Sequence, residues 1–155
     1  MIAPSHWVWG RFYMVNMLYA QIGAVFVVLA CVFAFLKGDD PERTGAGAFI
    51  FGWFASILVQ QELPEYSLIG VFVLDVAMLA VFCALAWKSR RSWPVWAAAL
   101  QLISVMSNTI VLIAPQTPLA SQLTVVNLAG YGVLICIAVG TFWAWQERKA
   151  SRGIE

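Results

Sequence analysis

Charged side chains are scarce in this chain of 155 residues, in which Lys and Arg number 9 and Asp and Glu number 8. They make up 11% of the residues, whereas soluble domains carry about 25%. Hydrophobic residues reach 62%, and the mean hydropathy is +0.82. A soluble fold of this size could not cover so much apolar surface with so few charges, but lipid can. The net charge of +1 also lacks the dense basic face that nucleic acid requires.

Histidine is nearly absent, since His6 is the only one. A bis-histidine haem or a multi-histidine metal site within one chain is therefore excluded. Cys31, Cys83 and Cys136 each lie in an apolar run and form no C-x-x-C pair, so we expect them to be packed side chains. The short loops contain no nucleophile beside a base and no Gly-rich phosphate loop. We expect no cofactor, no metal and no enzymatic activity.

Five apolar segments divide the chain. The predicted spans cover approximately residues 14–36, 46–60, 67–87, 94–114 and 123–145 of a single helical domain, 1–155. Roughly 20 residues suffice to cross a hydrocarbon core of about 30 Å. Gly38, the aspartates after it and Pro41 are predicted to end the first helix, and Pro94 suits the first turn of the fourth. The sequence predicts an all-α integral membrane protein, a bundle of five transmembrane helices.

Basic residues set the predicted topology. With five spans, most of them lie on one side of the membrane: Lys37, Arg43, Lys88, Arg90, Arg91, Arg148, Lys149 and Arg152. Only Arg11 lies on the other side. Because positive residues favour the cytoplasm, we expect the N-terminus outside and the C-terminus inside, in a bacterial inner (cytoplasmic) membrane. An interfacial belt is predicted on the cytoplasmic side: Trp87, Trp93, Trp96, Trp143 and Trp145.

The second segment leaves an alternative open. From Gly45 to Gln61 it holds about 17 residues, which is near the lower limit for a span. If it were re-entrant, the protein would have four spans and both termini inside. The uninterrupted apolar character of residues 46–59, apart from Ser56, favours five spans.

Small residues mark the predicted contacts between helices, because lipid provides no hydrophobic drive and close backbone approach must contribute. They recur at four-residue spacing in two segments: Ala48, Gly52 and Ser56 in the second, and Gly132, Cys136 and Gly140 in the fifth. We expect these stripes to serve packing within the chain, a homo-oligomer or contact with another membrane subunit.

Asp75 is the most informative residue, because it lies near the middle of the third span. An ionised aspartate at that depth costs several kcal/mol. No Lys, Arg or His lies within any predicted span to pair with it. Asp75 is therefore protonated, hydrated in a cavity or bonded to neutral polar groups.

Neutral partners are present on the fourth span, where Gln101, Ser104 and Asn108 share one helical face. Gln21 and Tyr131 fall in the same outer half of the membrane. Two interpretations remain open. These groups either form interhelical hydrogen bonds that set helix register, or they line a small polar cavity with Asp75 as a proton- or cation-responsive carboxyl.

Three stretches carry a resemblance: PER at 41–43, LDVAMLA around Asp75, and WPVWAAALQL at 93–102. They cover about a third of the chain and are similar to those of a group of small uncharacterised bacterial inner-membrane proteins. That group implies a multi-pass membrane protein and supplies no activity.

Two functions are consistent with these patterns. The first is a non-catalytic scaffold or accessory subunit that packs with itself or with other membrane proteins. The alternative is a small oligomeric transporter or ion-coupled permease that uses Asp75.

Overall fold

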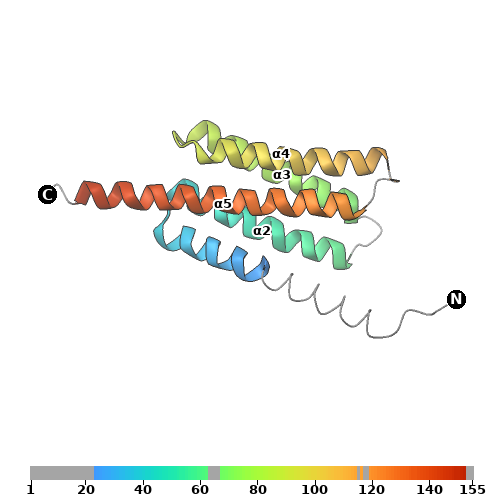
Figure 1. The fold of residues 1–155 in the computed structure, drawn as a ribbon, viewed down its shortest axis with the longest axis horizontal. Helices are drawn as coiled ribbons and strands as arrows, with labels where there is room; N and C mark the ends of the chain where they lie inside the picture. Colours follow the sequence, from blue (N-terminus) through green and yellow to red (C-terminus); the bar gives the residue numbers. More distant parts are fainter. Residues whose placement is uncertain (1–22, 63–66, 115, 117–118, 153–155) are drawn as a thin grey trace.

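The computed structural model describes residues 23–62, 67–114, 116 and 119–152 (Figure 1). Regular structure in these ranges consists of helices: Gly23–Lys37, α2 (Asp40–Glu62), α3 (Ser67–Lys88), α4 (Trp93–Ile113) and α5 (Leu119–Arg152). No strand occurs in the ranges described. The predicted all-α class is confirmed.

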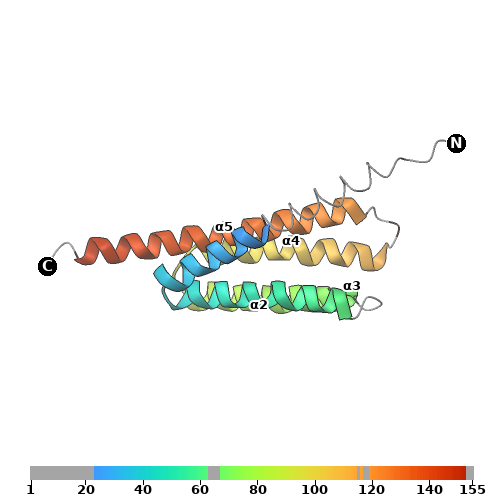
Figure 2. The same cartoon turned by 90° about the horizontal axis from the view of Figure 1, so that it is seen from below.

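Helices α2 to α5 form a bundle in which each helix packs against the next along the chain and α2 also contacts α5. Figures 1 and 2 show these helices running alongside one another, with α5 extending beyond the others toward the C-terminus. The Gly23–Lys37 helix crosses the bundle at an angle (Figure 2). Its residues Val27 and Cys31 belong to the same buried core as Val133 and Ile137 of α5.

The turn before α2 is short because one stretch ends a helix and begins the next. The Gly38 N–H donates to the Ala34 carbonyl oxygen at 2.8 Å and closes the first helix. The Glu42 carboxylate reaches back to the Asp39 N–H at 3.0 Å, as in a capping box. The first helix ends at Lys37, directly before Gly38, close to the predicted position. Pro41 takes no part in that end, contrary to the prediction. It lies in the first turn of α2, where its missing N–H breaks no helical hydrogen bond.

The helices differ most from the predicted segments at their polar ends. Helices α3 and α4 agree with spans 67–87 and 94–114 to within a residue. In contrast, α2 has 23 residues instead of the segment 46–60, and its length is about 35 Å. Helix α5 has 34 residues and continues through the charged tail beyond 145. Hydropathy detects only the apolar part of a helix, so polar turns at its ends were missed.

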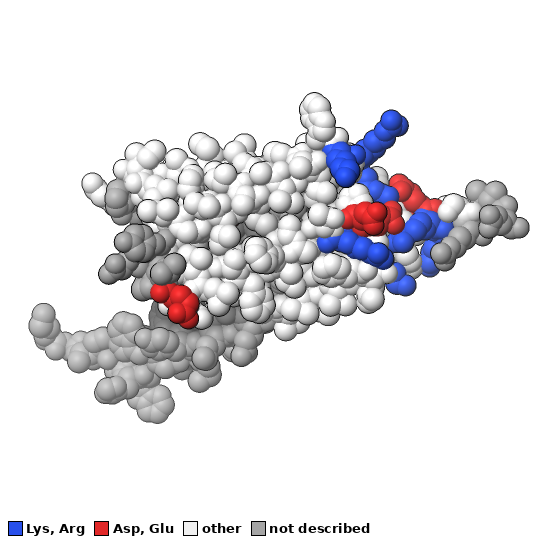
Figure 3. All heavy atoms as spheres, turned by 180° about the vertical axis from the view of Figure 1, so that it is seen from behind, with Lys and Arg blue, Asp and Glu red and all other residues white. Residues whose placement is uncertain are grey.

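Three helices are long and apolar enough to cross a membrane: α3, α4 and the stretch Ser121–Ser151 of α5. The described part of the first helix, Gly23–Lys37, is apolar but shorter. On the face in Figure 3, Lys and Arg gather at one end of the molecule, and the long middle carries no described charged side chain. Large apolar side chains also point outward along the helices, including Leu29, Phe51 and Leu128. Such a surface suits lipid.

Candidate functional site

Asp75 of α3 lies against α4, where two amides donate to its carboxylate. Gln101 Nε2 lies 2.8 Å from Oδ1, and Asn108 Nδ2 lies 2.6 Å from Oδ2. Gln101 Nε2 is also 3.4 Å from the Asp75 main-chain oxygen. Gln101 and Asn108 are buried, with 5% and 2% of their surface exposed. Both oxygens of the carboxylate therefore have a neutral donor from a neighbouring helix.

A third amide extends these contacts to α5. Gln122 Nε2 donates to Asn108 Oδ1 at 2.7 Å. Gln122 lies one residue before the predicted fifth span and was not predicted as a site residue. The sequence contained one signal for its inward position. Ala129 and Val133 follow at intervals of seven and four, so they share its helical face, and both are buried.

The hydrogen bonds all run in one direction. Gln122 donates to Asn108, Asn108 donates to Asp75, and Gln101 donates to Asp75. An ionised carboxylate only accepts hydrogen bonds, whereas an amide can both accept and donate. Replacing Asp75 by Asn alone would therefore place two amide donors face to face, and replacing Asn108 by Asp alone would place two carboxylates face to face. We call Asp75, Gln101, Asn108 and Gln122 the amide–carboxylate ladder.

The other predicted polar residues have different settings. Ser104 is buried, with 3% of its surface exposed, and lies on α4 between Gln101 and Asn108. The Tyr131 ring packs edge-on against Phe26, with ring centroids 6.2 Å apart, so this side chain faces the first helix. Gln21 lies outside the described residues.

A second polar cluster was not predicted, and its centre is Glu42. This carboxylate has 0% of its surface exposed. Oε1 accepts a hydrogen bond from Trp93 Nε1 at 2.8 Å and lies 3.5 Å from Arg91 Nε, while Oε2 accepts from the Asp39 N–H. A buried carboxylate without such partners would cost several kcal/mol. The string KGDDPER is typical of an exposed turn, so hydropathy offered no signal for this burial.

Ion pairs connect the Glu42 cluster to neighbouring segments of the chain. Arg91 Nη2 lies 2.8 Å from Asp39 Oδ2 and 3.4 Å from Glu147 Oε2. Arg148 Nη1 lies 3.2 Å from Asp39 Oδ1, and its Nη2 donates to the Lys37 carbonyl oxygen. The cluster therefore joins the start of α2, the turn before α4 and the end of α5.

Trp93 lies inside the bundle with 5% of its surface exposed, so its predicted place in an interfacial belt is wrong. A Cβ added at Gly45 would lie 2.6 Å from Trp93 Cη2, and one added at Gly140 would lie 2.4 Å from Cδ1. Two glycines from α2 and α5 thus hold the indole between them, and Glu42 binds its N–H. In contrast, Trp87, at 94%, and Trp96, at 67%, are exposed.

The predicted small-residue stripes contribute to packing within the chain. A Cβ at Gly52 would lie 2.9 Å from Met78 of α3, and one at Gly132 would lie 2.8 Å from Leu100 of α4. Cys136 packs against the hydrophobic core, and Ala48 and Ser56 are half-buried. Helices α2 and α5 therefore use these glycines to approach their neighbours closely.

The fold and its polar clusters define an all-helical bundle with at least three candidate membrane-spanning helices. Across residues 23–62, 67–114, 116 and 119–152, no three His, Cys, Asp or Glu side chains form a group that could hold a metal ion. No protein-family model, curated protein or solved structure matches the chain.

Proposed function

We propose that the chain is an integral inner-membrane protein of five spans, with its N-terminus outside and its C-terminus in the cytoplasm. The uncharged part of α2 between Arg43 and Glu62 supports this number, because its 18 residues extend about 27 Å, close to the hydrocarbon thickness of about 30 Å. The basic end seen in Figure 3 supports the orientation. The same end holds the Glu42 cluster, whose charges are suited to a membrane boundary.

Within that membrane we propose a non-catalytic role, as a scaffold or accessory subunit. The observation that carries this proposal is the amide–carboxylate ladder, in which both Asp75 oxygens are bonded to amides of α4 and Asn108 is bonded to α5. Polar groups that pair with one another across three helices set helix register. Asp75 then stabilises the bundle instead of acting on a substrate.

The surface for a partner is the outer face of α3. Phe82 is the one residue of α3 that is buried among its neighbours. Val73, Val76, Ala80 and Cys83 are all exposed and recur at spacings of three and four, so they lie on one face. We propose that a second copy or another membrane subunit packs on this face.

Cysteine cross-linking in native membranes tests this surface directly, because Cys83 is exposed on α3 whereas Cys31 is buried. Oxidation should give a covalent dimer that is lost in Cys83→Ser but kept in Cys31→Ser if copies associate through α3. A stoichiometric partner that co-purifies and cross-links at Cys83 indicates an accessory subunit. A chain that neither cross-links nor co-purifies with a partner contradicts the scaffold proposal.

The role of Asp75 is tested by exchanging it with Asn108. Asp75→Asn should insert normally but lower the apparent melting temperature in detergent, because two amide donors then face one another. Asn108→Asp should lower it further, because two carboxylates meet. The double exchange restores every donor–acceptor pair and should recover most of a loss of about 0.6–1.7 kcal/mol per bond. Gln101 and Gln122 remain unchanged throughout.

The same variants separate a structural role from transport. An ion-coupled permease would show pH-dependent flux in proteoliposomes that needs a carboxyl at position 75. Flux present in the wild type and absent from the refolded double exchange would overturn the non-catalytic proposal. Absence of flux in both proteins, together with recovered stability in the double exchange, supports it.

A further inference from the structure

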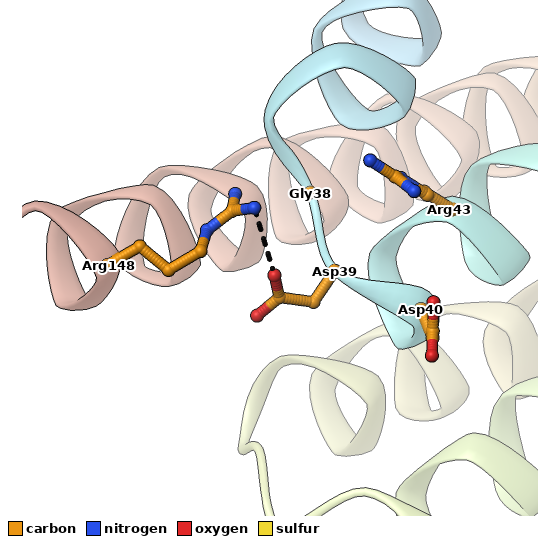
Figure 4. Close-up of a pocket in the computed structure, with 5 residues that line it drawn as sticks. All are labelled: Gly38, Asp39, Asp40, Arg43 and Arg148. Atoms are coloured by element: carbon orange, nitrogen blue, oxygen red, sulfur yellow. Dashed lines mark ion pairs between the residues drawn. The ribbon is translucent and has the colours of Figure 1, made fainter.

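The basic end of the bundle contains a pocket of about 270 Å³ that no part of the proposed scaffold role uses. Acidic and basic side chains both line this pocket. They come from the turn before α2, the first turn of α2 and the end of α5: Gly38, Asp39, Asp40, Arg43 and Arg148 (Figure 4). The pocket lies at the end of the molecule where Lys and Arg gather (Figure 3). Under the proposed topology this is the depth of the lipid headgroups.

Half of the charged lining is already paired. Arg148 and Asp39 point toward one another in Figure 4, with Nη1 and Oδ1 3.2 Å apart. The other two charged groups, Asp40 and Arg43, are exposed and have no hydrogen bond or ion pair from their side chains within the described ranges. The pocket therefore offers one cation and one anion that remain available to a ligand.

We propose that this pocket binds the phosphoethanolamine headgroup of a phospholipid. The Arg43 guanidinium receives the phosphate, because guanidinium matches phosphate oxygens in charge and geometry. The Asp40 carboxylate, beside Asp39, receives the ammonium group. Gly38 lies between the two arginines in Figure 4, and a Cβ at this position would collide with the Ala34 carbonyl oxygen and the Glu42 Cβ, so glycine is what lets the turn close at the pocket wall.

The neighbouring surface suits the rest of a lipid. Leu36, two residues before Gly38, has 70% of its surface exposed, and Phe35 has 45%. Acyl chains can therefore lie against the first helix while the headgroup occupies the pocket. A phosphatidylglycerol headgroup has no ammonium for Asp40, and a phosphatidylcholine headgroup has no N–H to donate to it.

This inference rests on the membrane placement proposed above. Native mass spectrometry of the full chain, released from nanodiscs made with equal parts of phosphatidylethanolamine, phosphatidylglycerol and phosphatidylcholine, measures which lipid is retained. We expect preferential retention of phosphatidylethanolamine. Arg43→Gln should reduce the ratio of lipid-bound to lipid-free protein about fivefold, as for one cation beside a phospholipid surface, and Asp40→Asn should remove the preference over phosphatidylglycerol.

Arg90→Gln is the matched control, because Arg90 is exposed at the same end but does not line the pocket. Equal losses of bound lipid in Arg43→Gln and Arg90→Gln would show that general surface charge retains the lipid, and would overturn the proposal. Retention of phosphatidylglycerol above phosphatidylethanolamine would also overturn it. Displacement of the lipid by millimolar inorganic phosphate would reassign the site to a free anion. Failure of the chain to fractionate with membranes would instead contradict the proposed placement itself.

Discussion

At the scale of single residues, the half-buried Asp75 carboxyl and the buried Glu42 carboxyl are held by different chemistry. Asp75 has neutral amide donors from α4, whereas Glu42 is bonded to an indole N–H and lies near the Arg91 guanidinium. The neutral partners are located in the apolar middle of the bundle, where no Lys or Arg of the described residues forms an ion pair with Asp75. The charged partner lies at the end, where Arg91 keeps 25% of its side-chain surface in contact with solvent. The hydrogen-bond partners of each carboxyl thus match its position, with neutral amides in the middle of the bundle and an arginine at its end.

Replacing Trp93 with Phe tests the contribution of the indole N–H. The ring remains between the glycines, but Glu42 Oε1 loses its 2.8 Å donor while staying buried. We expect a loss of about 1–3 kcal/mol, measured as a lower apparent melting temperature in detergent. Trp96→Phe, at an exposed position of the same helix, should change little. Equal effects of the two substitutions would show that the bond to Glu42 adds no stability.

At the scale of helices, glycines set how closely α5 approaches α4. Gly140 faces the Trp93 indole, which cannot move because Gly45 and Glu42 hold its other side. Gly132 faces the end of the Leu100 side chain, which can rotate away. Gly130 has nothing within 4 Å of an added Cβ. The three positions on one helix therefore differ in how far their neighbours can yield.

We expect Ala substitutions on α5 to follow that order. Gly140→Ala should destabilise by about 1–3 kcal/mol through overpacking, and Gly132→Ala should cost less. Gly130→Ala should be neutral or stabilising, since Ala favours a helix over Gly by up to about 1 kcal/mol. Thermal unfolding of the three variants in one detergent measures the order. A neutral Gly140→Ala would contradict the close packing around Trp93.

At the scale of the whole molecule, the face in Figure 3 carries its Lys and Arg side chains at one end and no described charged side chain along its middle. The Glu42 cluster lies at this end and fastens α2, α4 and α5 together through Asp39, Arg91 and Arg148. The amide–carboxylate ladder joins α3, α4 and α5 within the apolar part. Two separate polar clusters, one charged and one largely neutral, therefore stabilise the bundle at different depths.

Single-cysteine labelling of intact cells tests the five-span topology in a cysteine-free variant. A cysteine at Ser151, at the end of α5, should react only after the membrane is permeabilised, and one at Glu62, at the end of α2, should react from outside. Cysteine at Asp40, at the opposite end of α2, should behave like position 151. Labelling of positions 40 and 62 from the same side would favour the re-entrant alternative.

Part of the candidate site could be predicted because it depends on local periodicity. Asp75 interrupts a long apolar run, and the spacing of Gln101, Ser104 and Asn108 places them on one helical face. Gln122 was missed because it lies just outside the apolar window of its helix. The connection between Glu42 and Trp93 spans 51 residues, and no local pattern specifies such a pairing.

The amino-acid sequence alone determined the helical class, the approximate bounds of α3 and α4, and the shortage of charge that favours lipid over water. These properties follow from composition and from the hydropathy of consecutive residues. Only the tertiary structure decided that Trp93 is buried, that Pro41 begins a helix instead of ending one, and that Glu42 lies in the interior. Local sequence predicts that a charged turn and a tryptophan at a helix start are exposed. Here Glu42 and Trp93 are buried because they bond to one another and because Gly45 and Gly140 of neighbouring helices make room for the indole.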